Sequence, residues 1–381
     1  MVEITKMKAE KQKAEKEAFF CTTKELSRLG LEQIPTQFQS HKHLIYSSPA
    51  TLAFNSPGAE GFGVKRAGLA VPDSIMLIVA PGCCGRNTSL ISSMKEYNDR
   101  FYYLMMDETD IVTGRHLKKI PKAVEEICSV CPKKPSVVMI CITCVDALLG
   151  TDMERVCKKA EEQVEIPVRP CYMYALTREG RKPPMVHVRQ SLYSLLEPGK
   201  KKGNVVNLLG FFSPLVDDCE IYDLLHSAGV KTIHEISRCK DYKEYQTMSE
   251  ANFNLVLHHE ARFAAEDFHN RLQIPFIELR RLYQIDKIEN QYHALGNALG
   301  VAFYDEKYKK QAEDALEKFR QKCPDASFAI GECLNADPFE LSLALIRYGF
   351  SVPEIYGTIT VENFTYIRSL AKISPETKVF S

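Results

Sequence analysis

Short apolar runs alternate along the chain with longer stretches in which hydrophobic residues recur at helical spacing. The runs at residues 75–80, 101–106 and 137–142 are typical of buried strands, and residues 168–174 predict a fourth. The helices expected among them cover residues 88–97, 115–128 and 147–164. Strands that alternate with helices form right-handed βαβ units, so this part predicts a parallel, doubly wound sheet.

The same alternation returns twice further along the chain. Strands are expected at 204–210, 232–235, 253–257 and 274–277, and again at 327–331, 352–356 and 377–380. The last group amounts to only about half of a nucleotide-binding-type sheet, and a parallel sheet needs cover on both faces. We therefore predict an α/β fold of three successive Rossmann-like units, the last one incomplete.

A polar segment with Gly and Pro, residues 197–203, predicts a domain boundary. We expect an N-terminal α/β domain over residues 1–200 and a second Rossmann-like domain over residues 201–322. Residues 323–381 would be the start of a third domain, which either is truncated or is completed by another chain. The charged segment 4–30 is expected to be helical.

The charge balance excludes some classes of partner. Lysine plus arginine and aspartate plus glutamate both number 49, so no basic field favours nucleic acid or an anionic membrane. The N-terminus has no apolar signal segment, and no apolar run reaches the roughly 18 residues needed to span a bilayer. A cytoplasmic protein with reduced thiols is expected, so the 13 cysteines suggest metal or redox chemistry more than disulfides.

Cysteines follow two of the strands expected in the first sheet. Cys83 and Cys84 come after the strand at 75–80, and Cys144 comes after the strand at 137–142. Ligands bind beyond the carboxyl ends of parallel strands, so these thiols should share one edge of the sheet. Soft thiolates select zinc, copper(I) or iron–sulfur clusters. The sequence therefore predicts a metal site built from Cys84 and Cys144, with Cys83 as a third candidate ligand.

The remaining cysteines have a simpler interpretation, because free cysteine often serves as a small buried hydrophobic residue. Cys141 lies within its strand and should belong to the core. Cys128 and Cys131 form a C-x-x-C pair at a helix end, where structural thiols are favoured over a separate zinc site.

A histidine pair ends a strand of the second sheet. His258 and His259 follow the strand at 253–257, and the same rule for parallel strands places them at a ligand-binding edge. They are candidates for binding a cofactor, and the alternative is a polar pair at the surface or between domains.

Several of these segments resemble nitrogenase component 1. Pro81-Gly-Cys-Cys-Gly85 resembles the Gly-Cys-Gly turn of that family, and Cys144-x-x-x-Leu-x-Gly-x-Asp152 resembles its third cluster-cysteine turn. Thr109-Asp-Ile-Val-Thr-Gly114 is similar to its Asp-Ile-Val-x-Gly stretch. Asn254-Leu-Val-Leu-His258 resembles the second-domain strand near the active-site cofactor. The resemblance covers roughly residues 40–381.

The resemblance implies an iron–sulfur cluster held between two component 1-like chains, which form a homodimer or a heterodimer. It also implies a second partner, an ATP-hydrolysing reductase similar to the nitrogenase iron protein. By match to the family motifs, Cys84 corresponds to the second cluster ligand and Cys144 to the third, while Cys83 is an extra thiol. A second metallocofactor or a tetrapyrrole is a further possibility within the family.

The sequence also departs from the family pattern. The first cluster cysteine falls near Ala59, so that ligand is missing, and the cofactor-anchoring cysteine falls near His258. Two or three thiolates from each chain would suit a single [4Fe–4S] cluster shared across a dimer. Dinitrogen reduction is therefore poorly supported.

Three functions remain open at this point. The first is an electron-accepting subunit that reduces an unidentified substrate. The second is a scaffold that holds a metallocluster during assembly. The third is a metal-free α/β protein that binds a metabolite, which the absence of a phosphate-binding G-x-x-x-x-G-K-[ST] loop weighs against.

Overall fold

The computed structural model describes residues 19–39, 63–82, 95, 97, 99–143, 145, 149–172, 182–331 and 336–380. The chain forms two compact units, and each is described by itself. One unit consists of residues 54–280, and the other combines residues 1–53 with residues 281–381.

The first sheet of the unit formed by residues 54–280 is entirely parallel. Its strands are β2 (Ile75–Ala80), β3 (Phe101–Met105), β4 (Val138–Ile142) and β5 (Val168–Tyr172), in the spatial order β3-β2-β4-β5. The chain runs outward from β2 to β3 and then crosses to β4, so the order reverses between β2 and β4. This reversal is a topological switch point, where doubly wound sheets bind their ligands.

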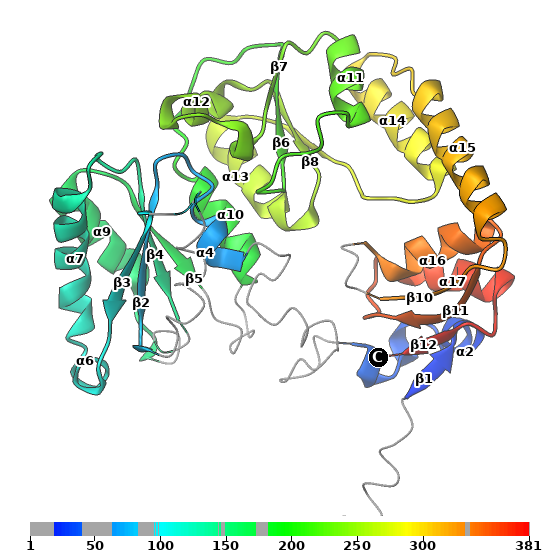
Figure 1. Cartoon of the computed structure of the whole chain (residues 1–381), viewed down its shortest axis with the longest axis horizontal. Helices are drawn as coiled ribbons and strands as arrows, with labels where there is room; N and C mark the ends of the chain where they lie inside the picture. The colour runs from blue at the N-terminus through cyan, green and yellow to red at the C-terminus, as the bar shows by residue number, and fades with distance from the viewer. Residues whose placement is uncertain are drawn as a thin grey trace, which may run out of the picture. The chain divides into compact units, whose positions relative to one another are not determined.

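Both faces of this sheet are buried, as the apolar runs of β2 and β4 require. One face packs against α7 (His116–Val130) and α9 (Met153–Val164), and the other against α4 (Gly63–Ala67) and α10 (Pro184–Tyr193) (Figure 1). The short helix α6 (Glu108–Thr113) precedes α7.

The second sheet of this unit repeats the plan of the first. Its strands are β6 (Val205–Leu209), β7 (Thr232–His234), β8 (Phe253–Val256) and β9 (Phe276–Glu278), in the order β7-β6-β8-β9. The helices with it are α11 (Glu220–Ser227), α12 (Tyr242–Gln246) and α13 (Arg262–Leu272). The order again reverses once, between β6 and β8, so this sheet has its own switch point.

Helix α10 joins the two sheets into one unit. Its residues Val188 and Leu192 belong to a hydrophobic core that also contains Met139 of the first sheet and Val256 of the second. The Tyr245 hydroxyl donates a hydrogen bond to the Leu192 carbonyl at the end of the helix. Side chains from both sheets therefore pack in one hydrophobic core around α10, while the other face of the first sheet has a core of its own.

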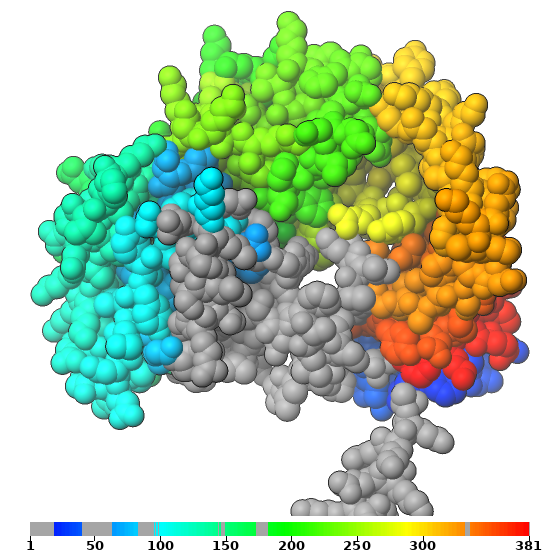
Figure 2. Space-filling view, in the orientation of Figure 1, coloured from blue at the N-terminus to red at the C-terminus, as the bar shows by residue number. Residues whose placement is uncertain are grey.

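The other unit contains the third sheet, with spatial order β1-β12-β11-β10. The strands β10 (Ser327–Ile330), β11 (Ser351–Tyr356) and β12 (Lys378–Phe380) are parallel, and β1 (Phe20–Thr22) pairs antiparallel with β12. Its helices are α2 (Thr23–Leu29), α14 (Ile285–Leu299), α15 (Glu306–Lys322), α16 (Pro338–Arg347) and α17 (Phe364–Ile373). Helix α15, coloured orange, lies on the outside of this unit and buries none of its residues (Figure 2).

The predicted fold class is confirmed, since three sheets with parallel strands follow one another along the chain. Two local predictions are wrong. Residues 20–22 are a strand because β12 offers them a hydrogen-bonding edge. The single helix expected over 147–164 is interrupted, because Leu149 is helical but Gly150 takes a positive φ of 64°, and Asp152 caps a new helix that begins at Met153. The helix predicted over 88–97 lies outside the described residues, apart from isolated positions.

Candidate functional site

The first candidate edge lies at the switch point between β2 and β4. These strands are hydrogen-bonded neighbours in parallel register, with Val79 opposite Ile142. Neighbouring strands lie roughly 5 Å apart, so the segments that leave them start side by side. The predicted ligands Cys83, Cys84 and Cys144, and the position Ala59, lie outside the described residues.

The described residues at this edge show how the two segments begin. The Ala80 carbonyl accepts hydrogen bonds from the Met106 amide at 3.0 Å and from the Tyr103 hydroxyl at 3.0 Å, which anchors the end of β2. Thr143, directly before Cys144, is fully buried, and its hydroxyl has no hydrogen-bond partner among the described residues. A buried hydroxyl without a partner is costly, and a donor of this kind beside a cluster stabilises its sulfurs. An unpartnered hydroxyl directly before Cys144 in the chain is compatible with a thiolate-bound cluster.

The motif after β3 has a structural explanation. Asp107 caps α6 by accepting from the Asp110 amide at 2.7 Å, and Gly114 ends the helix at a positive φ of 65°. The Asp110 carboxylate binds Lys119 and Arg115, both at 2.6 Å. These cations hold the pKa of Asp110 far below its usual range, Lys119 contributing most. The Asp-Ile-Val stretch thus keeps a rigid turn at the same edge of the sheet.

The interpretation of Cys141 as a core residue is confirmed. Its side chain is fully buried within β4 and belongs to the core shared with α10. Burial also raises the pKa of its neighbour Cys171 well above the usual value. Thiols that are buried in this way do not supply thiolate ligands to the edge.

The second candidate edge lies at the switch point between β6 and β8, where Gly210 and His258 follow the two strands. Gly210 has a φ of 138°, and a Cβ placed on it would lie 2.8 Å from the Cβ and the amide nitrogen of His258. Glycine is therefore required for the two segments to approach this closely. The Leu257 amide donates to the Leu209 carbonyl at 2.8 Å and fixes their relative position.

Arg189 of α10 ties both segments together. Its Nε and Nη2 donate to the Gly210 carbonyl at 2.9 and 2.7 Å, and its Nη1 donates to Glu260 at 2.6 Å. The side chain is only 1% exposed, and its guanidinium lies 4.7 Å from the centroid of the Phe212 ring. A buried charge of this kind is retained only when it is paired, as it is here.

The two predicted histidines differ in burial but stack on each other. His258 is buried and His259 is exposed, and their ring centroids are 4.5 Å apart. The Glu260 amide donates to Nδ1 of His258 at 3.3 Å, and the Glu260 carboxylate lies 3.8 Å from the same nitrogen. Phe211 packs edge-on against the His258 ring. The edge thus presents an imidazole whose Nδ1 side is supported by one glutamate.

Sequence reasoning missed three polar residues at this edge, namely Arg189, Glu260 and Glu235. Glu235 is buried after β7, where its carboxylate accepts from the Leu215 amide at 2.9 Å and from Arg238 at 2.9 Å. A signal for Arg189 was present, because it is the only lysine, arginine, aspartate or glutamate in α10. Its partners Gly210 and Glu260 are distant in sequence, so no local pattern indicated them.

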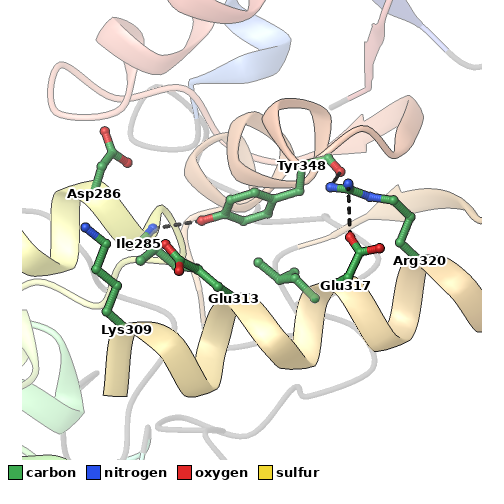
Figure 3. A pocket seen from close by; sticks show the side chains of 8 residues that line it. Ile285, Asp286, Lys309, Glu313, Glu317, Arg320 and Tyr348 are labelled. Carbon is green, nitrogen blue, oxygen red and sulfur yellow. Dashed lines mark hydrogen bonds and ion pairs between the residues drawn. The ribbon is translucent and has the colours of Figure 1, made fainter. Parts of the chain in front are cut away.

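An open hollow of about 400 Å³ lies in the other unit, among α14, α15 and Tyr348 (Figure 3). Both cations that line it are already paired, Lys309 with Glu289 at 2.8 Å and Arg320 with Glu317 at 3.3 Å. The Tyr348 hydroxyl accepts from the Ile285 amide at 2.7 Å. The contacts of these side chains are therefore internal to the unit.

The fold and its two switch-point edges define an α/β protein built from successive Rossmann-like units. A family model described as "Nitrogenase component 1 type Oxidoreductase" matches residues 60–348. The chain belongs to this family. None of the described helices has both the length and the apolar character needed to cross a membrane.

Curated relatives of the chain carry the name "Nitrogenase iron-molybdenum cofactor biosynthesis protein NifE". The protein from Nostoc sp. is 25% identical over 284 residues, which is 71% of this chain and 58% of the relative. The one from Clostridium pasteurianum is 24% identical over 65% of this chain and 54% of the relative. The one from Methanosarcina barkeri is 27% identical over 49% of this chain and 43% of the relative. The chain thus spans about half the length of the curated relatives it matches.

A solved structure titled "Nitrogenase Cp1 at pH 6.5" aligns with a TM-score of 0.65 at 18% identity. The alignment covers 92% of this chain and 80% of the other. At this level of identity the likeness shows the shared fold alone.

Proposed function

We propose that the protein is a nitrogenase-like component 1 subunit that receives electrons from an ATP-dependent, iron-protein-like reductase and passes them to a substrate not yet identified. Cys84 and Cys144, with Cys83, would hold a [4Fe–4S] cluster between two chains. When bound, such a cluster accepts one electron at a time. The proposal includes a homodimer or a heterodimer and a reducing, cytoplasmic location.

The observation that carries this proposal is the pairing of β2 with β4 at the switch point of the first sheet. This pairing starts both thiol-bearing segments from the same edge, which a shared cluster requires. The buried Thr143 hydroxyl supports the proposal as a donor to thiolate or sulfide. The fully buried strands beneath keep water away from one side of this edge, and such burial tunes the potential of a cluster.

We further propose His258, with His259, as the part of the second edge that binds a second metallocofactor or a tetrapyrrole. A neutral imidazole ligates through the nitrogen that does not carry the proton. Nδ1 of His258 accepts from the Glu260 amide at 3.3 Å, so a neutral ring carries its proton on Nε2 and would donate it to a polar group of the cofactor, while the Glu260 carboxylate lies 3.8 Å from Nδ1. Arg189 holds that carboxylate in place, so Glu260 acts as a positioning residue.

Iron content and visible absorption of anaerobically purified protein test the cluster. We expect about one [4Fe–4S] cluster per dimer, and its loss in a Cys84→Ser, Cys144→Ser double variant, while Cys323→Ser, at an exposed cysteine of the other unit, keeps full loading. His258→Ala should keep the cluster and lose the second cofactor or product formation. Normal iron loading in the double variant, or a stable cluster-bearing monomer, would contradict the assignment.

A second function, a scaffold for metallocluster assembly, is favoured by the names of the curated relatives, which are cofactor biosynthesis proteins. Both functions use the same thiols, so iron loading does not separate them. Sustained ATP-dependent product formation with a reductase supports the electron-accepting subunit. Release of the cluster to an acceptor protein without sustained turnover supports the scaffold.

A further inference from the structure

A second pair of thiols lies at the opposite end of the first sheet from the proposed cluster. Cys128 belongs to the last turn of α7 and Cys131 caps the helix, and both are half-buried against the core between α7 and the sheet. The Cys131 amide still donates to the Ile127 carbonyl at 3.0 Å, so helical spacing extends to Cys131. Residues three apart in a helix have Cα atoms roughly 5 Å apart, which lies within the range that a disulfide bridges.

Tyr102, near the amino end of β3, contacts one of the two thiols. Its hydroxyl oxygen lies 3.1 Å from the sulfur of Cys131. This hydrogen bond, with burial, raises the pKa of Tyr102 to about 12, so the phenol keeps its proton at neutral pH and can donate to a Cys131 thiolate. Burial and then the charge of Cys131 raise the pKa of Cys128. The two thiols therefore differ in their surroundings, because the phenol of Tyr102 contacts Cys131, whereas burial raises the pKa of Cys128.

Zinc is a poor match for this pair. A structural zinc site takes four ligands. Within the part of the chain that the structure describes, no three histidine, cysteine, aspartate or glutamate side chains come together as a metal site. Two thiols and a phenol at a helix end suit thiol–disulfide chemistry better, because that reaction needs only an attacking thiolate and a second thiol within reach.

We propose that Cys128, Cys131 and Tyr102 form a thiol–disulfide exchange site for low-molecular-weight disulfides. The Cys131 thiolate attacks one sulfur of the external disulfide, whose S–S bond breaks and releases a first thiolate that takes a proton from water. Cys128 then loses its proton and attacks the Cys131 sulfur of the mixed disulfide, which releases a second thiol. In total, two protein thiols are oxidised to one disulfide, and one external disulfide is reduced to two thiols.

The test uses a single tryptic peptide, residues 123–133, which contains both thiols and no other cysteine. The purified full chain is equilibrated without oxygen in a series of oxidised-to-reduced glutathione ratios, alkylated in acid, digested and weighed. We expect the peptide to change from doubly alkylated to internally disulfide-bonded as the ratio rises. A peptide that stays doubly alkylated, or that carries only a glutathione adduct at the oxidising end, overturns the proposal.

Two variants separate exchange from a merely structural role. Cys128→Ser should stop the reaction at a glutathione adduct on Cys131. Tyr102→Phe should lower the alkylation rate of Cys131 at neutral pH by roughly threefold or more, because the reacting sulfur loses its contact with the phenol. Unchanged alkylation in Tyr102→Phe contradicts the role of the phenol. The exposed Cys323, alkylated in the same samples, reports whether each preparation reacts normally.

Discussion

At the scale of single residues, burial decides which polar groups matter. Arg189 is enclosed in the molecule yet fully paired, and it positions both the carbonyl of Gly210 and the carboxylate of Glu260. Thr143 is enclosed with no hydrogen-bond partner for its hydroxyl among the described residues. These hydrogen bonds of Arg189 lie within the protein, whereas the Thr143 hydroxyl is the buried group that the proposed cluster would give a partner.

His187 of α10 provides a test of burial through the pH dependence of stability. Burial, with a smaller effect of Lys182, lowers the pKa of His187 to about 4. The unfolded chain, with an ordinary pKa near 6.5, then binds more protons than the folded one below that pH, so this group makes the protein less stable as the pH falls from about 6.5 to about 4.

Replacing the imidazole should remove this part of the pH dependence. Between pH 7 and pH 4.5, we expect the unfolding free energy of His187→Gln to rise by up to about 3 kcal/mol relative to that of the original chain. Urea titration of both proteins at each pH measures this difference. Parallel pH profiles for the two proteins would contradict a half-buried His187 whose pKa is lowered in the folded protein.

At the scale of elements, each of the first two sheets reverses its strand order once, and the strands that precede the candidate site residues flank that reversal. The turn after β6 must pass directly beside the turn after β8, and only a residue without a side chain allows it. Gly210 therefore fixes how near His258 comes to the neighbouring strand. The same arrangement of strands brings different side chains to the two edges.

Substitution of Gly210 tests this close approach. Gly210→Ala should destabilise the protein by about 2 kcal/mol or more, because of its positive φ and the contact with His258, and should displace the imidazole from the edge. Gly203→Ala is the matched control, since nothing lies within 4 Å of a Cβ at that position. Equal thermal stability of the two variants would refute the role given to Gly210.

At the scale of the whole molecule, the chain forms two compact units, one of which unites its N-terminal and C-terminal parts. The pairing of β1 with β12 joins the described segments at the two ends of this unit. Within the same unit, the buried Glu340 carboxylate accepts from the amides of Tyr283 and Gln284 and so holds the start of α14 against α16. Each unit thus has a buried polar group that links its own segments, Arg189 in one and Glu340 in the other.

We expect these units to unfold in separate steps. Arg189→Gln should lower the unfolding free energy of the unit formed by residues 54–280 alone, by about 3 kcal/mol, because it leaves Glu260 and the Gly210 carbonyl without their partner. Glu340→Ala should lower the unfolding free energy of the other unit alone, by about 1–3 kcal/mol, because the amides of Tyr283 and Gln284 lose their acceptor. Calorimetry measures both transitions, and a single transition that both variants lower equally would show that the chain unfolds as one unit.

Local sequence patterns predicted much of the fold, but they failed for some short elements. The apolar runs of β2, β4, β6 and β8 identified the buried strands, because strands covered on both faces have no polar side. The short strand β1 was mistaken for part of a helix, since three residues carry too little pattern and their partner β12 lies at the other end of the chain.

The sequence by itself determined the alternation of strands and helices, the core position of Cys141, and which strands are followed by cysteines or histidines, because these depend on spacing along the chain. The tertiary structure alone decided which strands are neighbours and where their order reverses. It also brought Arg189 to Gly210 and Glu260, and Tyr102 to Cys131. Such contacts join residues from separate elements, and local sequence patterns do not predict how distant elements pack against each other.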